Sequence, residues 1–434
     1  MIALPRWKTT FVASWIAQVC SIIGFSMVVP FLPFYVRELG IHDEKSVLLW
    51  SGWGLAGSAG LTMALLAPFW GVMADRYGRK LMVMRSMFGG MVVLSLMALV
   101  HNIWQLLALR ILQGALTGTV SASVALVSSV VPERRAGFAL GLMQTALMVG
   151  NSVGPWIGGH CAESFGYRVP FLIAGVFLLA GGLLTAFGVH EGFDPEEARQ
   201  AQQFGSLRGV IMQAGFPSLI GLLFMVQFVS AFTGPILPLF IEKLSHLPAG
   251  QAAGITGNIF GVAGLAAAVS AAIIGRLSDN WGHGRVLTVC MLLTGIVLFP
   301  HALAQSTDQL MSLRILVALA SAGITPSANA IIRALIPRSA CGKAFGIVQS
   351  FTCLGWGIGP AIGSSLAAGM GMRLPFVVVG AAFLLTAALA AAVLPRTQQR
   401  IAEARASALA VAGSPGPQVC NQQTDCAPTL GSRE

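Results

Sequence analysis

Two arginines are the residues inside the apolar part of this chain whose chemistry stands out. Arg110 lies in the run Leu-Arg-Ile-Leu-Gln-Gly, and Arg314 occupies the equivalent place in a second, partial copy that lacks the Gln-Gly pair. An arginine inside a membrane-spanning segment is costly unless it faces a cavity or a partner. We therefore predict that Arg110, Gln113 and Arg314 bind substrate or take part in proton coupling. For Arg110, a side chain that extends to the outer membrane surface is the alternative.

Carboxylates are missing from the middle of every apolar segment. Among the 16 acidic residues, the closest candidates are Glu38, Glu163 and Glu242, near segment ends, with His160 beside Glu163. We count Glu163 among the candidate coupling residues. Proton coupling through a central carboxylate is therefore not supported by the residues themselves.

The residue pattern also argues against an enzyme. The sequence contains no Ser-His-Asp arrangement, its 7 cysteines follow no metal or disulfide spacing, and its single Gly-Lys pair is not part of a phosphate-binding loop. We expect no metal, no cofactor and no ATP-driven step.

Residues about 204 or 205 positions apart repeat along the chain. Pro30 returns as Pro235, and the run Arg-Val-Pro-Phe from Arg168 returns as Arg-Leu-Pro-Phe from Arg373. A duplicated apolar chain predicts two halves that rock around a site between them, as in a secondary transporter.

The composition requires lipid as the solvent for much of the chain. Hydrophobic residues make up 55% and charged residues 10%, and the mean hydropathy is +0.77. A soluble protein holds roughly 25% charged residues. Twelve apolar stretches reach the length that a bilayer needs, at residues 9–36, 47–73, 81–100, 103–131, 138–161, 169–189, 211–241, 251–277, 286–305, 309–336, 344–367 and 374–394. We predict an all-α integral membrane protein of two pseudo-symmetric six-helix bundles.

The predicted domains follow from these stretches. An N-terminal bundle (1–189) and a C-terminal bundle (211–394) are joined by a polar cytoplasmic linker (190–210), and a tail (395–434) is predicted to be disordered in its later part. Most of the 26 lysines and arginines fall on one side of this topology, which places both termini in the cytoplasm. The net charge of +10 is spread over short loops and indicates no nucleic-acid partner.

A charged turn joins the second and third stretches. It reads Gly71-Val-Met-Ala-Asp75-Arg76-Tyr-Gly78-Arg79-Lys80, and its second copy keeps Asp279 but loses two basic residues. Gly71 permits close helix approach and Gly78 a tight turn. A plain basic turn that only sets topology is the alternative.

A glycine run marks the fifth stretch. Gly150, Gly154 and Gly158 recur every four residues on one helix face, where a neighbouring backbone can approach closely, and Pro155 adds a kink. Ordinary small-residue packing is the alternative to a role in transport.

Together, the charged turn, the Arg110 run and the glycine run resemble the major facilitator superfamily, and within it the twelve-span drug:proton antiporter branch, over about residues 8–395. The resemblance implies that the Asp75 turn latches the halves on the cytoplasmic side in the outward-facing state. It also implies that the Arg110 run belongs to proton-coupled exporters and the glycine run to antiporters. Spans 1, 4, 7 and 10 line the central cavity in this family. We therefore choose as cavity candidates, with their symmetry mates, Gln18, Phe25, Gln144, Gln227, Phe228, Phe232, Asn329 and Gln349.

These observations predict an inner-membrane, multi-pass secondary transporter. We expect it to export amphipathic drugs or metabolites in exchange for protons by alternating access, with lipid around it, as a monomer. A dedicated exporter of one natural product, such as a siderophore, is the first alternative. A non-transporting membrane sensor or lipid-handling protein is the second.

Overall fold

The computed structural model describes residues 6–192, 216–335 and 341–413. These residues form helices and short turns, without a strand among them. The first half contains α1 (Arg6–Ser26), α2 (Leu32–Glu38), α3 (Glu44–Leu49), η1 (Trp50–Gly57), α4 (Ser58–Tyr77), α5 (Arg79–Met97), α6 (Ile103–Leu116), α7 (Thr119–Val130), α8 (Glu133–Phe165) and α9 (Val169–Gly188). The second half contains α12 (Phe216–Ala231), α13 (Ile236–Ser245), α14 (Ala249–Trp281), α15 (His283–Leu298), η2 (Phe299–Leu303), α16 (Thr307–Ser321), α17 (Ile324–Leu335), α18 (Cys341–Met370) and α19 (Leu374–Gly413).

The all-α membrane fold predicted from the sequence is confirmed. Within the described ranges, nine helical segments are long and apolar enough to cross a membrane, and each coincides with one of the twelve predicted spans. The other three predicted spans are occupied by α6 with α7, by α8 and by α18. The number twelve itself stays a prediction.

The predicted linker and tail lie mostly outside the described residues. Only residues 190–192 of the linker are described, and α19 continues through residues 395–413 of the predicted tail.

Glycines at equivalent positions end the helices of both halves. Gly78 separates α4 from α5 with φ of 94°, and Gly282 separates α14 from α15 with φ of 89°. Gly166 lies between α8 and α9 with φ of 82°, and Gly371 lies between α18 and α19 with φ of 94°. Left-handed φ values favour glycine because it lacks a Cβ. The repeated sequence therefore builds the same helical turns twice.

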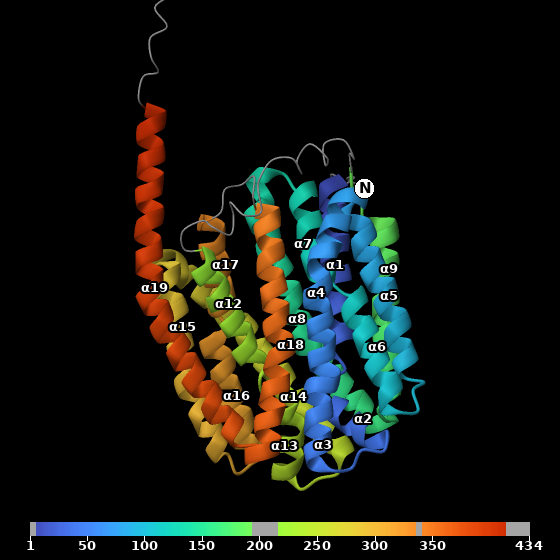
Figure 1. Cartoon of the computed structure of the whole chain (residues 1–434). Helices are drawn as coiled ribbons and strands as arrows, with labels where there is room; N and C mark the ends of the chain where they lie inside the picture. Colours follow the sequence, from blue (N-terminus) through green and yellow to red (C-terminus); the bar gives the residue numbers. More distant parts are fainter. Residues whose placement is uncertain (1–5, 193–215, 336–340, 414–434) are drawn as a thin grey trace, which may run out of the picture.

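The two halves meet along two helix pairs. In one pair, α8 packs against α14, and in the other, α4 with η1 packs against α18. We call the end of the bundle that carries α2, α3 and α13 the α2–α13 end, and the end where α9 stops and α12 begins the linker end (Figure 1).

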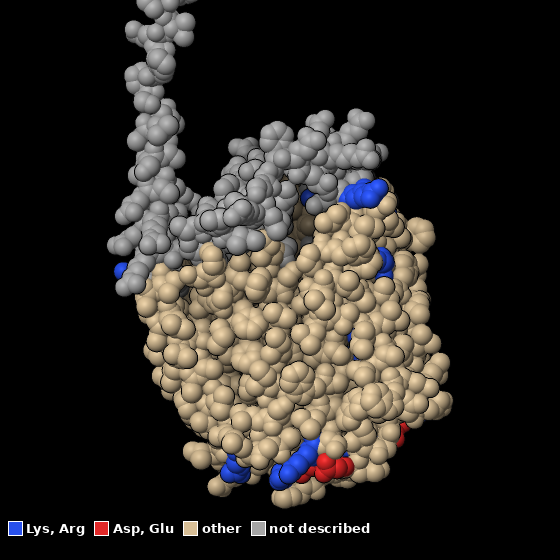
Figure 2. All heavy atoms as spheres, in the orientation of Figure 1, with Lys and Arg blue, Asp and Glu red and all other residues tan. Residues whose placement is uncertain are grey.

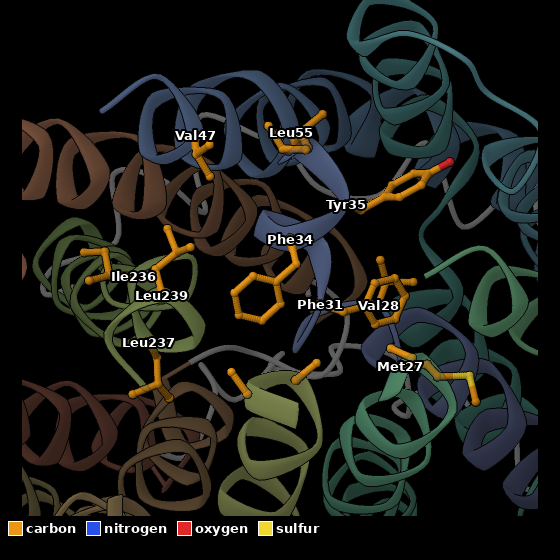
Figure 3. Packing of buried hydrophobic residues seen from close by; sticks show 14 of the residues in the cluster. Met27, Val28, Phe31, Phe34, Tyr35, Val47, Leu55, Ile236, Leu237 and Leu239 are labelled. Atoms are coloured by element: carbon orange, nitrogen blue, oxygen red, sulfur yellow. The ribbon is translucent and has the colours of Figure 1, made fainter. Parts of the chain in front are cut away.

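A continuous apolar core closes the α2–α13 end. Phe31 and Phe34 from the first half and Leu237 and Leu239 from the second are at most 1% exposed and belong to one cluster (Figure 3). Tyr35 joins them and donates a hydrogen bond from its hydroxyl to the carbonyl of Met97 at 2.9 Å. Burial of such side chains is the main favourable term in packing the halves, so this core is the seal of that end.

Candidate functional site

Arg110 is a buried cation on α6. Its side chain is 9% exposed, and Nη1 donates to Gln113 Oε1 at 3.1 Å, one helical turn away. Nε and Nη2 are buried and have no hydrogen-bond partner among the described residues. The predicted pair of Arg110 and Gln113 is therefore formed, and it leaves part of the guanidinium unsatisfied.

Arg314 on α16 has different partners. Its Nη2 donates to Thr233 Oγ1 at 3.2 Å, in the turn between α12 and α13, and its guanidinium carbon lies 5.9 Å from the Phe376 ring centroid. The Phe376 ring also stacks on His301, which is fully buried, with ring centroids 5.7 Å apart. The residue of the first half that corresponds to Thr233 is Val28. The repeat thus preserves the arginines but not the groups that hold them.

An ion pair joins the halves at the α2–α13 end. Arg37 Nη1 lies 2.6 and 2.7 Å from the two carboxylate oxygens of Glu242. Lys243 Nζ lies 3.7 Å from Glu44 Oε1 beside it. These four side chains, with Leu239 and Met372, line a cavity of about 200 Å³. Figure 2 shows acidic and basic atoms side by side at this end.

Tyr167 lies near this ion pair, close enough to interact electrostatically with Glu242 and Arg37. Its ring stacks on Phe31 with centroids 6.0 Å apart. Burial, followed by the nearby carboxylates of Glu242 and Glu38, raises the pKa of Tyr167 to about 12. The hydroxyl therefore stays protonated at physiological pH.

Glu163 lies at the interface between α8 and α14. Its carboxylate is 3.5 Å from His160 Nδ1 and packs against Gly254 of α14. His160 Nε2 is 2.9 Å from Asn258 Oδ1, which is also on α14. Glu163 is exposed near the end of its helix, so the structure connects this carboxylate to the contact between the halves.

The glycine run of α8 packs against α1 inside the first half. A Cβ added at Gly150 would meet Ile22, one at Gly154 would meet Ser26 and Ile23, and one at Gly158 would meet the backbone of Met27. The predicted close approach of a neighbouring backbone is therefore present. Its neighbour could not be named from helical spacing alone.

The same segment of α8 also contacts the other half. A Cβ at Gly159 would collide with Ala253 and Gly257 of α14, and the carbonyl of Pro155 lies against Gly257. The second half repeats the inner contact, because Gly355 and Gly359 of α18 pack against α12.

The charged turn at the linker end binds its own half. Glu191 accepts hydrogen bonds from the backbone N–H groups of Arg79 at 3.0 Å and Lys80 at 2.7 Å, and so caps α5. Arg79 Nη1 donates to the Ala125 carbonyl and Lys80 Nζ to the Ala186 carbonyl. The sequence does not predict this role of Glu191, because the cap forms only when the chain returns to the start of α5 after α9.

The remaining latch residues are placed more simply. Arg76 is exposed, with its guanidinium carbon 5.4 Å from the Tyr77 ring centroid. A Cβ added at Gly71 would meet no described atom within 4 Å, and the same holds for Gly275 at the equivalent position. The side chains of Asp75 and Asp279 lie outside the described set.

The cavity candidates fall into different surroundings. Gln18 is 1% exposed and neither atom of its amide has a hydrogen-bond partner among the described residues. Phe25 packs against Gly90 of α5, and Phe232, 2% exposed, packs against Gly363 of α18. Gln349 donates to Cys353 Sγ at 3.2 Å. The other candidates are half-buried, namely Gln144, Gln227, Phe228 and Asn329.

Comparison with known proteins gives consistent matches over most of the chain. The model of the family described as Major Facilitator Superfamily matches residues 14–264 and 219–415. The multidrug resistance protein MdtG of Dickeya zeae is 36% identical over 390 residues, which cover 88% of this chain and 93% of that protein. The multi-drug resistance efflux pump PmrA homolog of Lactococcus lactis is 35% identical and covers 83% of this chain and 89% of its own.

Solved structures share the fold at low sequence identity. The human organic anion transporter MFSD10 superposes with a TM-score of 0.70 at 18% identity, covering 89% of this chain and all of that one. A bacterial homolog of the human lysosomal transporter Spinster superposes with a TM-score of 0.71 at 16% identity, covering 92% of this chain and 98% of that one.

Proposed function

Because this chain belongs to the major facilitator superfamily, we propose that it is a secondary active exporter of amphipathic drugs or metabolites that works by alternating access in exchange for protons. Its matching family and relatives are transporters, so the prediction that it is not an enzyme is confirmed. The names of its curated relatives favour multidrug export over a dedicated natural-product exporter or a membrane sensor.

One observation carries the mechanism: the contacts between the halves are concentrated toward the α2–α13 end. Close backbone approaches join Gly60 to Gly357 and Gly159 to Gly257, both on the α2–α13 side of their helices. Ser152 Oγ donates to the Gly261 carbonyl at 2.6 Å across the same interface. Toward the linker end, Gly71 and Gly275 have no described atom within contact distance. The structure is therefore closed at one end, as one state of an alternating transporter must be.

Glycine at positions 71 and 275 fits a second state in which the linker end closes. A residue without a Cβ allows two helices to approach, yet no atom of the described residues lies within 4 Å of an added Cβ at either position. If both termini are cytoplasmic, the observed state faces inward and the second state faces outward. The latch role proposed for the Asp75 turn belongs to that second state.

Arg110 and Arg314 are the side chains that we propose for substrate or proton handling. Each donates a single hydrogen bond to a neutral acceptor, so neither positive charge is neutralised within the described residues. A fixed cation in a low-dielectric surrounding attracts anionic groups and repels cations. This supports neutral, zwitterionic or anionic amphiphiles as the preferred substrates.

A vesicle assay tests the proposed exchange. Inverted membrane vesicles that contain the full chain should accumulate a fluorescent amphiphile when a proton gradient is imposed, and an ionophore that collapses the gradient should abolish the accumulation. Vanadate should have no effect. Accumulation that continues unchanged without a proton gradient would exclude proton exchange.

A further inference from the structure

Arg85 is a cation on α5 that no described residue neutralises. Its guanidinium carbon lies 3.3 Å from the centroid of the Trp70 ring. Nε and Nη1 are buried without a hydrogen-bond partner, and the side chain makes no ion pair or hydrogen bond with the described part of the chain. An aromatic face offsets only part of the cost of holding a guanidinium among apolar helices.

The side chain lies where α4 and α5 meet the break between α6 and α7. The indole N–H of Trp70 donates to the Ala115 carbonyl at 2.7 Å, which fixes the ring on the last turn of α6. Nη2 of Arg85 is 3.9 Å from the place that a Cβ of Gly118 would take. We call the surface formed by Trp70, Arg85 and the break at residues 117–118 the Arg85 patch.

The residues beside the Arg85 patch are apolar and exposed. On α5, Leu81 is 49% and Val92 48% exposed, and on α4, Phe69 is 51% exposed. In a membrane, exposed leucine, valine and phenylalanine face lipid. Figure 2 shows basic atoms within the otherwise uncharged surface over α4 and α5.

The depth of Arg85 suits a lipid headgroup. It follows the first residue of α5 by six positions, or about 9 Å of helix. Side chains on a helix tilt toward its N-terminus, so the guanidinium is directed back toward the linker end, where Arg76 is also exposed.

The second half shows that the fold does not require a cation at this place. The residues equivalent to Trp70, Arg85 and Gly118 are Ile274, Val289 and Gly323. There, the atoms nearest to a Cβ added at Gly323 belong to Ile274 and Cys290, and Val289, in the place of Arg85, is an exposed apolar residue. A charge that the repeated fold manages without, and that no described residue neutralises, fits a partner from outside the chain.

We propose that the Arg85 patch binds the phosphate of an anionic phospholipid, with its acyl chains along the exposed apolar residues of α4 and α5. The guanidinium matches phosphate in geometry and charge, and Trp70 holds it in place. Net negative headgroups are preferred because the other basic residues of the linker end add to the positive potential.

Native mass spectrometry of the full-length protein, released from detergent after exposure to defined lipids, tests this binding site. The wild-type protein should retain one phosphatidylglycerol and release phosphatidylethanolamine. Arg85→Gln should lower phosphatidylglycerol retention about fivefold. Lys45→Gln, which removes an exposed cation of the opposite, α2–α13 end, is the control and should retain the lipid like the wild type. Thermal unfolding of each variant checks that it is folded.

Three outcomes would overturn the proposal. Equal retention by Arg85→Gln and the wild type would show that the lipid binds elsewhere. Displacement of the bound lipid by millimolar inorganic phosphate would indicate a soluble anion as the ligand. Equal retention of phosphatidylglycerol and phosphatidylethanolamine by the wild type, a comparison that needs no variant, would show that headgroup charge is not recognised.

Discussion

Arg37 and Glu242 occupy equivalent positions of the two repeats, 205 residues apart, and form an ion pair with each other across the α2–α13 end. A pseudo-twofold axis brings equivalent positions together where they lie close to it. At these two positions the repeats carry opposite charges instead of identical residues, so the contact that the symmetry creates is attractive. The partly exposed pair stabilises the closed end by about 1 kcal/mol.

This relationship predicts the effect of exchanging the charges. Glu242→Arg should place two guanidinium groups against each other and open the α2–α13 end. The double variant Arg37→Glu with Glu242→Arg should restore closure, since the positions are equivalent. Accessibility of a cysteine at Leu237 to a membrane-impermeant maleimide measures the opening. Failure of the double variant to recover protection would mean that the ion pair does not hold the halves together.

Bulky substitutions at two glycines should have opposite effects. Gly159→Leu collides with the backbone of α14, so it should disfavour the closed α2–α13 end and leave the linker end able to close. Gly71→Leu meets no described atom in the present state, so it should leave this state intact and block closure of the linker end. Cysteine accessibility from each side of the membrane measures both. Gly369→Leu, at another position without close neighbours, is the control, and parallel shifts in the first two variants would refute the two-state assignment.

The two copies of the charged turn should differ in importance. Asp75→Asn should lower transport more than Asp279→Asn, because the second turn carries Asn280 and His283 where the first has Arg76 and Arg79. Loss of a partner from a buried charge pair costs about 3–5 kcal/mol at most, enough to shift a two-state equilibrium. Initial transport rates at matched membrane levels are the measurement. Equal losses at both positions would contradict the asymmetry.

The preference of the transporter for substrate charge should depend on Arg110. Arg110→Lys keeps the charge but loses the planar guanidinium that Gln113 binds, so transport of anionic amphiphiles or its proton dependence should fall several-fold. The opposing possibility is that aromatic residues such as Phe228 bind cations. Transport of a matched anion and cation by vesicles decides between them, and export of the cation alone would show that the charge argument is wrong.

The sequence predicts local features of this fold better than long-range pairings. The turn at Gly78 and the close-packing face at Gly150 follow from the sequence and are found in the structure. The pairing of Arg37 with Glu242, the cap formed by Glu191 and the contact of His301 with Phe376 were not anticipated. Helical periodicity shows which face is buried, but not which helix lies against it.

One signal for a long-range contact was nevertheless present in the sequence. Arg37 and Glu242 differ in charge at the repeat spacing, and this is visible once the repeats are aligned. Arg110 and Arg314 also occupy equivalent positions of the two repeats, yet their partners Gln113 and Thr233 come from unrelated positions. Alignment of repeats therefore finds contacts near the axis and not those within one half.

The most direct test of alternating access measures both ends of the molecule in the same sample. Spin labels at Tyr77 and Trp281, exposed at equivalent ends of α4 and α14, report on the linker end. Labels at His42 and Leu247, both exposed, report on the α2–α13 end. With the 7 native cysteines replaced, pulsed electron spin resonance gives both distances at high and low pH, with and without substrate. The account predicts that the Tyr77–Trp281 distance shortens under the conditions in which the His42–Leu247 distance lengthens. Distances that change in the same direction, or that do not change at either end, would contradict it.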